Sequence, residues 1–120
     1  MAWTYDNSLG GDVNDAIITK LNGGTMEFVT SGNTVLASLA LANPCATKSN
    51  KVLTFATISD DTSADADGTI ASARFKDSGG TVRISGIGVA TSGSNVIVVN
   101  TLTVITGKNV SVTSLTFTQP

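Results

Sequence analysis

The spacing of apolar residues changes along the chain, from a helical period near the start to a strand period in the remainder. In the first segment, apolar side chains recur three or four residues apart, at Val13, Ala16, Ile17 and Leu21. Asp12 is a suitable N-cap, and Asn22 followed by glycine can end a helix in the left-handed conformation. We therefore predict one short α-helix over residues 12–22, preceded by an N-terminal arm over residues 1–11.

From residue 25 onward, apolar and polar residues alternate over short runs that are separated by Gly, Asn, Asp and Ser. The clearest run covers residues 69–76, where Ala73 and Phe75 would face inward and Arg74 outward. In the next run, residues 81–85, Val82 and Ile84 would face inward. These runs predict β-strands with one buried face.

Two runs depart from this alternation. Leu36 interrupts the run over residues 34–42, and the apolar residues of 110–118 fall into two phases, which a β-bulge near 113–114 would reconcile. About eight strands at roughly ten-residue spacing are typical of a sandwich or barrel. The fold class we expect is all-β, a jelly-roll-like antiparallel β-sandwich with one short N-terminal α-helix, whose strands over residues 25–118 form a single domain spanning residues 1–120.

Composition supports a β fold and excludes one class of partner. Of the 120 residues, 13% are charged, against about 25% in a typical soluble domain, and Ser, Thr, Gly and Asn take their place. The seven Lys and Arg residues are scattered, and the formal net charge is −2. Nucleic-acid binders usually carry a clustered basic surface, so we expect no nucleic-acid partner.

Neither a membrane segment nor a disulfide is predicted. The first residues have no basic or apolar stretch of the kind found in a signal peptide, and the longest apolar runs are far shorter than the roughly 20 residues of a membrane span. Cys45 is the only cysteine, which we expect to be a small buried apolar residue. We expect a protein that folds where it is made and has no membrane partner.

The absence of histidine limits the chemistry that the sequence can support. Without histidine, the Ser-His-Asp and Cys-His arrangements and most zinc sites cannot be built. Glu27 is the only glutamate and lies inside a predicted strand. We therefore expect no enzymatic activity, no catalytic residue and no cofactor.

One acidic loop is a candidate calcium site. Asp60, Asp61, Asp65 and Asp67 lie within eight residues, and Ca²⁺ takes six to eight oxygen ligands. The spacing is not that of an EF-hand loop, and the same residues are typical of a solvated loop. Both interpretations stay open from the sequence, with the solvated loop favoured.

Four residues are candidates for an interface with another protein. Trp3 and Tyr5 could anchor an N-terminal arm on a neighbouring subunit, or could pack on their own helix or sheet. Arg74 and Arg83 would lie on facing strands of one hairpin, on its polar side. They could meet acidic residues of a partner, or form an ordinary solvated face.

Four segments carry a resemblance to a known class of proteins: the helix over 13–21, the strand over 35–41 (VLASLAL), the loop, strand and turn over 66–80 (ADGTIASARFKDSGG), and the strand pair over 102–120. Through these segments, and along nearly its whole length, the chain resembles short virion proteins encoded by tailed bacteriophages. The resemblance implies a jelly-roll capsid decoration (cement) protein that stabilises the major capsid shell.

The resemblance also implies where such a protein acts and with what. It would be made in the cytoplasm of the bacterial host and would lie on the capsid exterior of the virion. There it would bind the major capsid protein as a homo-oligomer, with a trimer favoured and a dimer possible. Two other functions remain open: a carbohydrate- or receptor-binding β module of a phage fibre or adhesin, and another virion part such as a head–tail connector or tail protein.

Overall fold

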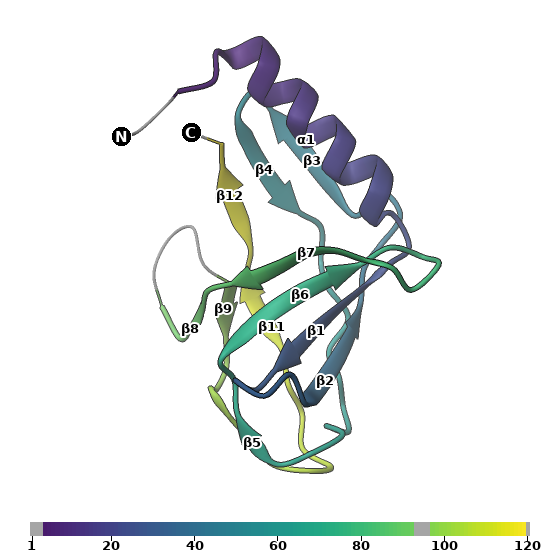
Figure 1. The fold of residues 1–120 in the computed structure, drawn as a ribbon, viewed down its shortest axis with the longest axis vertical. Coiled ribbons are helices and arrows are strands. Elements are labelled where there is room, and N and C mark those ends of the chain that lie inside the picture. The colour runs from purple at the N-terminus through teal and green to yellow at the C-terminus, as the bar shows by residue number, and fades with distance from the viewer. Residues whose placement is uncertain (1–3, 93–96, 120) are drawn as a thin grey trace.

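The structure, a computed structural model, describes residues 4–92 and 97–119, and these residues form a mostly β fold with one helix and several antiparallel sheets (Figure 1). The helix is α1 (Asn7–Leu21). The strands are β1 (Thr25–Val29), β2 (Val35–Ala40), β3 (Ala46–Ser49), β4 (Val52–Phe55), β5 (Gly68–Thr69), β6 (Ser72–Lys76), β7 (Val82–Ile87), β8 (Val89–Ala90), β9 (Ile97–Val99), β10 (Thr103–Val104), β11 (Val112–Ser114) and β12 (Thr116–Thr118).

The helix begins at Asn7, earlier than the predicted start at residue 12, so the second half of the predicted arm is helical. Its N-cap is Asp6, whose Oδ1 accepts a hydrogen bond from the backbone N–H of Leu9 at 2.7 Å. Gly10 and Gly11, which precede the predicted start, therefore lie within the helix. Both are buried in it, and a Cβ at Gly10 would overlap the side chain of Lys51. The glycines therefore allow α1 to approach the β3–β4 turn closely.

The predicted end of the helix is confirmed. Gly23 has a φ of +69°, in the left-handed region that a glycine stop uses. Asn22 at the C-cap also accepts a hydrogen bond through Oδ1 from the backbone N–H of Cys45, at 2.8 Å. Cys45 is buried as expected, and this burial raises the pKa of its thiol.

The largest sheet has four antiparallel strands in the order β2-β1-β6-β7. Met26 of β1 lies opposite Leu39 of β2 and Phe75 of β6, and all three side chains are fully buried. This face of the sheet meets the other strands in the core, where the rings of Phe55 and Phe75 stack with centroids 5.2 Å apart. Figure 1 shows α1 above this sheet, next to β3 and β4.

Three smaller sheets complete the fold: β12-β4-β3, β11-β9-β8 and β10-β5. All their pairings are antiparallel except that of β8 with β9, which is parallel. The described residues form twelve short strands in place of about eight, partly because predicted runs are divided between sheets. The bulge predicted near 113–114 is confirmed: Val112 pairs with Val99 and Ser114 with Val98, so Thr113 is an extra residue on β11. The run is also divided between two sheets, because β11 pairs with β9 and β12 with β4, and the buried Leu115 lies between them.

β7 is more irregular than its sequence suggests. Phe75 pairs with Ile84 and Lys76 with Val82, so Arg83 is an extra residue on β7, and Val82 is 42% exposed instead of facing inward. A second extra residue lies between Ile84 and Ile87, near Gly86 at a φ of +72°. The two bulges place both isoleucines on the same, inner face.

Candidate binding surface

The acidic loop packs along the outer edge of β2. The backbone N–H of Ser38 donates to Asp61 Oδ2 at 2.9 Å, and the backbone N–H of Asp65 donates to the carbonyl of Leu36 at 2.8 Å. Ser59 N–H donates to the carbonyl of the last residue of β2, at 3.2 Å. Residues 59–65 therefore supply hydrogen-bond partners to a strand edge that would otherwise be open.

Leu36 departs from the alternating pattern because it is an extra residue on β2: Val35 pairs with Val29 and Ala37 with Phe28, which leaves Leu36 without a partner in β1. Its side chain is fully buried in the hydrophobic core. A Cβ at Gly68 would lie 3.0 Å from Leu36 Cδ2, so a larger residue at this position would require the Leu36 side chain to shift. Ala64 of the acidic loop is also buried.

Asp67 joins the loop to the turn that follows β10. Its Oδ1 accepts hydrogen bonds from the backbone N–H of Thr106 at 2.6 Å and from the Thr106 hydroxyl at 2.8 Å. These two bonds hold the pKa of the Asp67 carboxyl below its ordinary value, with the backbone bond contributing more. Asp60 lies apart from this pair, where its Oδ2 is 3.5 Å from the side-chain amide of Asn109.

The four aspartates therefore do not form a common ligand set. In the part of the chain that the structure describes, no group of three or more His, Cys, Asp and Glu side chains could hold a metal ion. The geometry gives the calcium interpretation no support. A freely solvated loop is also an incomplete description, because Asp61 and Asp67 hold backbone segments in place.

Arg74 is engaged within its own sheet. Its Nε lies 2.7 Å from Glu27 Oε1, on the residue directly opposite in β1, and Lys76 Nζ lies 3.3 Å from Glu27 Oε2. The Glu27 side chain is only 10% exposed and that of Arg74 24%. Two cations thus compensate one buried carboxylate, a pairing that the sequence analysis did not foresee because Glu27 lies far from both in the sequence.

Arg83 does not share a surface with Arg74, contrary to the expectation that both lie on the polar side of the hairpin. Because it occupies a bulge, Arg83 lines a hollow beside α1 together with Ile84 and Lys20. Its Nε also lies 2.8 Å from Asp77 Oδ2 in the β6–β7 turn. The Asp77 pKa is lowered, first by the backbone N–H of Thr81 and then by Arg83.

The aromatic candidates at the N-terminus are described only in part. Trp3 lies outside the described residues. Tyr5 is half-buried, and its carbonyl accepts a hydrogen bond from Lys51 Nζ at 3.1 Å. Asn14, which the sequence analysis missed, is fully buried in α1. Its side-chain amide donates a hydrogen bond to the Asn50 carbonyl at 3.0 Å, and its Oδ1 accepts one from Gln119 Nε2 at 2.9 Å. No spacing rule marks such a residue before the fold is known.

Two adjoining hollows form a groove between α1 and β7 that closes on β12. We call it the α1–β7 groove; it is lined by Val13, Ala16, Ile17, Lys20 and Leu21 of α1, by Arg83, Ile84 and Ile87 of β7, and by Phe117, Thr118 and Gln119 at the C-terminal end. The hollow nearer Arg83 has a volume of about 350 Å³ and the one nearer Phe117 about 310 Å³. Ile17 and Ile84 line both hollows, so the groove is continuous.

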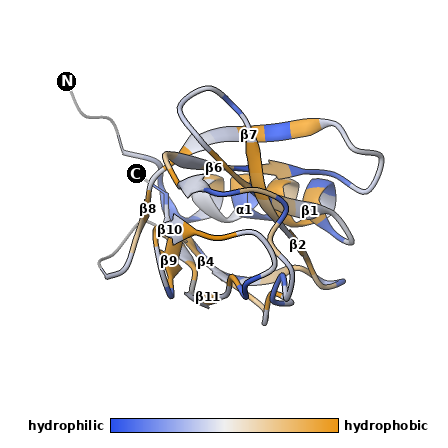
Figure 2. Cartoon of the chain, turned by 90° about the horizontal axis from the view of Figure 1, so that it is seen from below, coloured by the Kyte–Doolittle hydropathy of each residue, from blue (hydrophilic) through white to orange (hydrophobic). Residues whose placement is uncertain are grey.

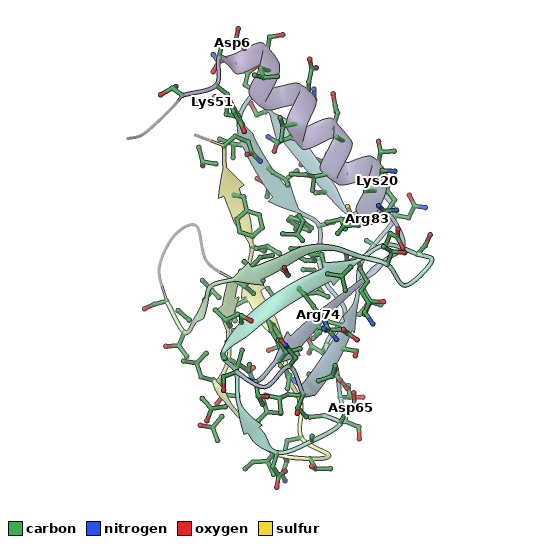
Figure 3. The ribbon with its side chains drawn as sticks, viewed as in Figure 1. Asp6, Lys20, Lys51, Asp65, Arg74 and Arg83 are labelled. Carbon is green, nitrogen blue, oxygen red and sulfur yellow. The ribbon has the colours of Figure 1, made fainter. Side chains whose placement is uncertain are left out.

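The groove is apolar along its length and cationic at one end. In Figure 2, hydrophobic positions along β7 are separated by one strongly hydrophilic residue and by a stretch of intermediate hydropathy. Figure 3 shows Lys20 and Arg83 together at the C-terminal end of α1, whereas Asp6 and Lys51 lie at the opposite end of the helix. Lys20 makes no ion pair with any residue that the structure describes.

Comparisons with known proteins found no match from which a function could be assigned to this surface. No protein-family model, no curated protein and no solved structure matches the chain. Within residues 4–92 and 97–119, no helix is both long enough and apolar enough to cross a membrane.

Proposed function

We propose that this protein is a structural component of a tailed-bacteriophage particle, a capsid decoration (cement) protein that binds the major capsid protein on the outside of the shell. The observation that carries the proposal is the resemblance of the sequence, along nearly its whole length, to small virion proteins of this kind. A jelly-roll-like arrangement of the sheets belongs to the same proposal, as does assembly into a homo-oligomer, for which a trimer is favoured over a dimer.

The structure supports this role through its rigidity. The helix is fixed to the β3–β4 turn and to the C-terminal segment by the two hydrogen bonds of Asn14. The acidic loop is fixed to β2 by Asp61 and to the following turn by Asp67. A molecule whose loops are held by buried or charged hydrogen bonds changes little in shape on binding, which suits a clip between capsid subunits. Multiple copies on one shell would then compensate for weak individual contacts.

The experiment that tests the proposal locates the protein in particles. An antibody raised against the recombinant chain is applied to tailed particles isolated from the bacterium that encodes it, and bound antibody is imaged by gold labelling. We expect label distributed over the surface of the head. Label on the tail or fibres would instead indicate a tail or receptor-binding component, and particles without label would contradict a virion role. Light scattering after size exclusion then gives the oligomeric state.

A further inference from the structure

Within the described residues, the outer edge of β7 is open, unlike that of β2. Among these residues, β7 is the last strand of the four-stranded sheet and pairs only with β6. Among residues 4–92 and 97–119, no backbone hydrogen bond joins residues 82–87 to any other segment. An open edge presents unpaired N–H and C=O groups, which another extended chain can pair with.

This open edge forms one wall of the α1–β7 groove. The bulge near Gly86 turns both Ile84 and Ile87 toward the groove, and Ile17 of α1 and Phe117 of β12 form the facing wall. A strand added to β7 would place every second side chain between these walls. Because α1 and β12 bound the far side, the space suits the side chains of one strand and not the edge of a second folded sheet.

The charges at one end set the chemistry of the occupant. Lys20 and Arg83 line the same hollow, and the only ion pair between them and a described residue is that of Arg83 with Asp77. Two cations around one acidic side chain leave a net positive charge at this end. A carboxylate of the occupant would therefore be favoured there.

We propose that the α1–β7 groove binds one extended segment of a partner protein, which pairs with β7 as a fifth strand, places apolar side chains at alternate positions in the groove and directs a carboxylate toward Lys20 and Arg83. The inference rests on the proposed function only for the identity of that partner, the shell protein. The groove chemistry can be tested on the isolated protein, so its failure and the failure of the virion role are distinguishable.

The test uses a panel of synthetic ten-residue peptides that carry Val, Leu, Ile or Phe at alternate positions, Thr between them and a free C-terminal carboxylate. Each is titrated to about 1 mM into the isotope-labelled full chain, and binding is followed by NMR. We expect shift changes concentrated in β7, α1 and β12 and slower amide exchange in β7. N-methylation of alternate peptide nitrogens, which removes their donors, should weaken binding by about tenfold or more.

Two matched variants separate the contributions. Lys20→Glu should reduce the preference for a free carboxylate over an amidated C-terminus, whereas Lys108→Glu, at another exposed lysine away from the groove, should leave that preference unchanged. Ile84→Thr should weaken the binding of every peptide that binds the wild-type protein. Val82→Thr, on the opposite face of β7, should leave peptide binding unchanged. Unfolding midpoints of the four variants confirm that each is folded during the titration.

Three results would overturn the proposal. The first is that no peptide of the panel binds, or that the shift changes lie outside the groove. The second is concentration-dependent self-association that protects β7 without peptide, which would make a second copy of the chain the occupant. The third is peptide binding only after residues 1–3 are deleted, which would make the chain's own N-terminus the occupant.

Discussion

The two edge strands of the four-stranded sheet, β2 and β7, differ in whether another described segment forms hydrogen bonds with their outer edge. At β2, the acidic loop forms hydrogen bonds with the backbone N–H of Ser38 and with the carbonyl of Leu36, whose side chain is fully buried in the core. At β7, no other described segment pairs with the edge, the strand carries two bulges, and Val82 is exposed beside an apolar groove. One edge is therefore part of the folded core, and the other is a surface.

This difference shows that an acidic loop can serve a purely structural purpose. Carboxylates accept hydrogen bonds from backbone N–H groups strongly, because the acceptor is charged. Asp61 uses this property to close a strand edge where no further strand is available. At the other edge, bulges and a nearby cation limit uncontrolled pairing without covering the strand, which leaves it accessible to a specific partner.

The largest expected effect comes from removing the side chain beneath the closed edge. Leu36→Ala should lower the free energy of unfolding by about 2–5 kcal/mol, because it creates a cavity in the hydrophobic core next to this edge. Val82→Ala, at the open edge, should change it by less than about 1 kcal/mol. Denaturant unfolding of the two variants measures both. Equal losses would contradict the distinction between a core edge and a surface edge.

A smaller effect is expected from the carboxylate that closes β2. Asp61→Ala leaves the backbone N–H of Ser38 without its acceptor, which should cost about 1–3 kcal/mol of unfolding free energy. Asp60→Ala is the matched control in the same loop, because Asp60 is exposed and makes only a 3.5 Å contact with Asn109. Addition or chelation of Ca²⁺ should alter neither protein. If Asp60→Ala lowers the unfolding free energy as much as Asp61→Ala does, the proposed role of Asp61 in closing the β2 edge is wrong.

At the open edge, the ion pair of the β6–β7 turn should contribute little. Arg83→Ala should change the unfolding free energy by at most about 1 kcal/mol, since the Arg83 side chain is 41% exposed and water screens the pair. The same variant should raise the pKa of Asp77 part of the way toward its ordinary value, because one of the bonds to its carboxylate is lost. A stability loss as large as that of Leu36→Ala would mean that this edge also belongs to the core.

The smallest expected effect is a pH dependence at the closed edge. The folded-state pKa of Asp67 is depressed, so its stabilising contribution is complete above the ordinary aspartate pKa of about 3.9 and is lost as the pH falls through the lower, folded-state value. Thr106→Val removes the hydroxyl donor and should shift the titration of Asp67 upward, though not fully, because the backbone bond remains. Carboxyl-carbon NMR detects the shift, and an unchanged titration would contradict the assignment.

The sequence predicted the local elements better than their partners. The helix stop at Asn22 and Gly23 and the alternating run that became β6 depend on neighbouring residues, so their patterns are readable in the chain. The predicted helix start was wrong because Asp6, not Asp12, is the N-cap, and Gly10 lies inside the helix where Lys51 approaches it closely. That approach depends on the fold and has no local signal.

The candidate site depended even more on long-range contacts. The sequence suggested Arg83 as a candidate interface residue beside Arg74, but a bulge places it at the hollow next to α1. The pairing of Glu27 with Arg74 joins residues on different hairpins, and the groove itself brings α1, β7 and β12 together. Leu36 was a usable signal: an apolar residue that breaks the alternation can mark a β-bulge, and Leu36 is the extra residue between the pairs of Val35 and Ala37 with β1.

The central claim is that the β2 edge is closed and the β7 edge is open, and amide hydrogen exchange of the isolated protein tests it most directly. The amides of Ser38 and Asp65, bonded across the closed edge, should exchange at least about tenfold more slowly than the outward-facing amides of residues 82–87, a difference of about 1.4 kcal/mol in opening free energy. Equal protection of the two edges at low protein concentration would contradict the account, because β7 would then be paired in the free protein.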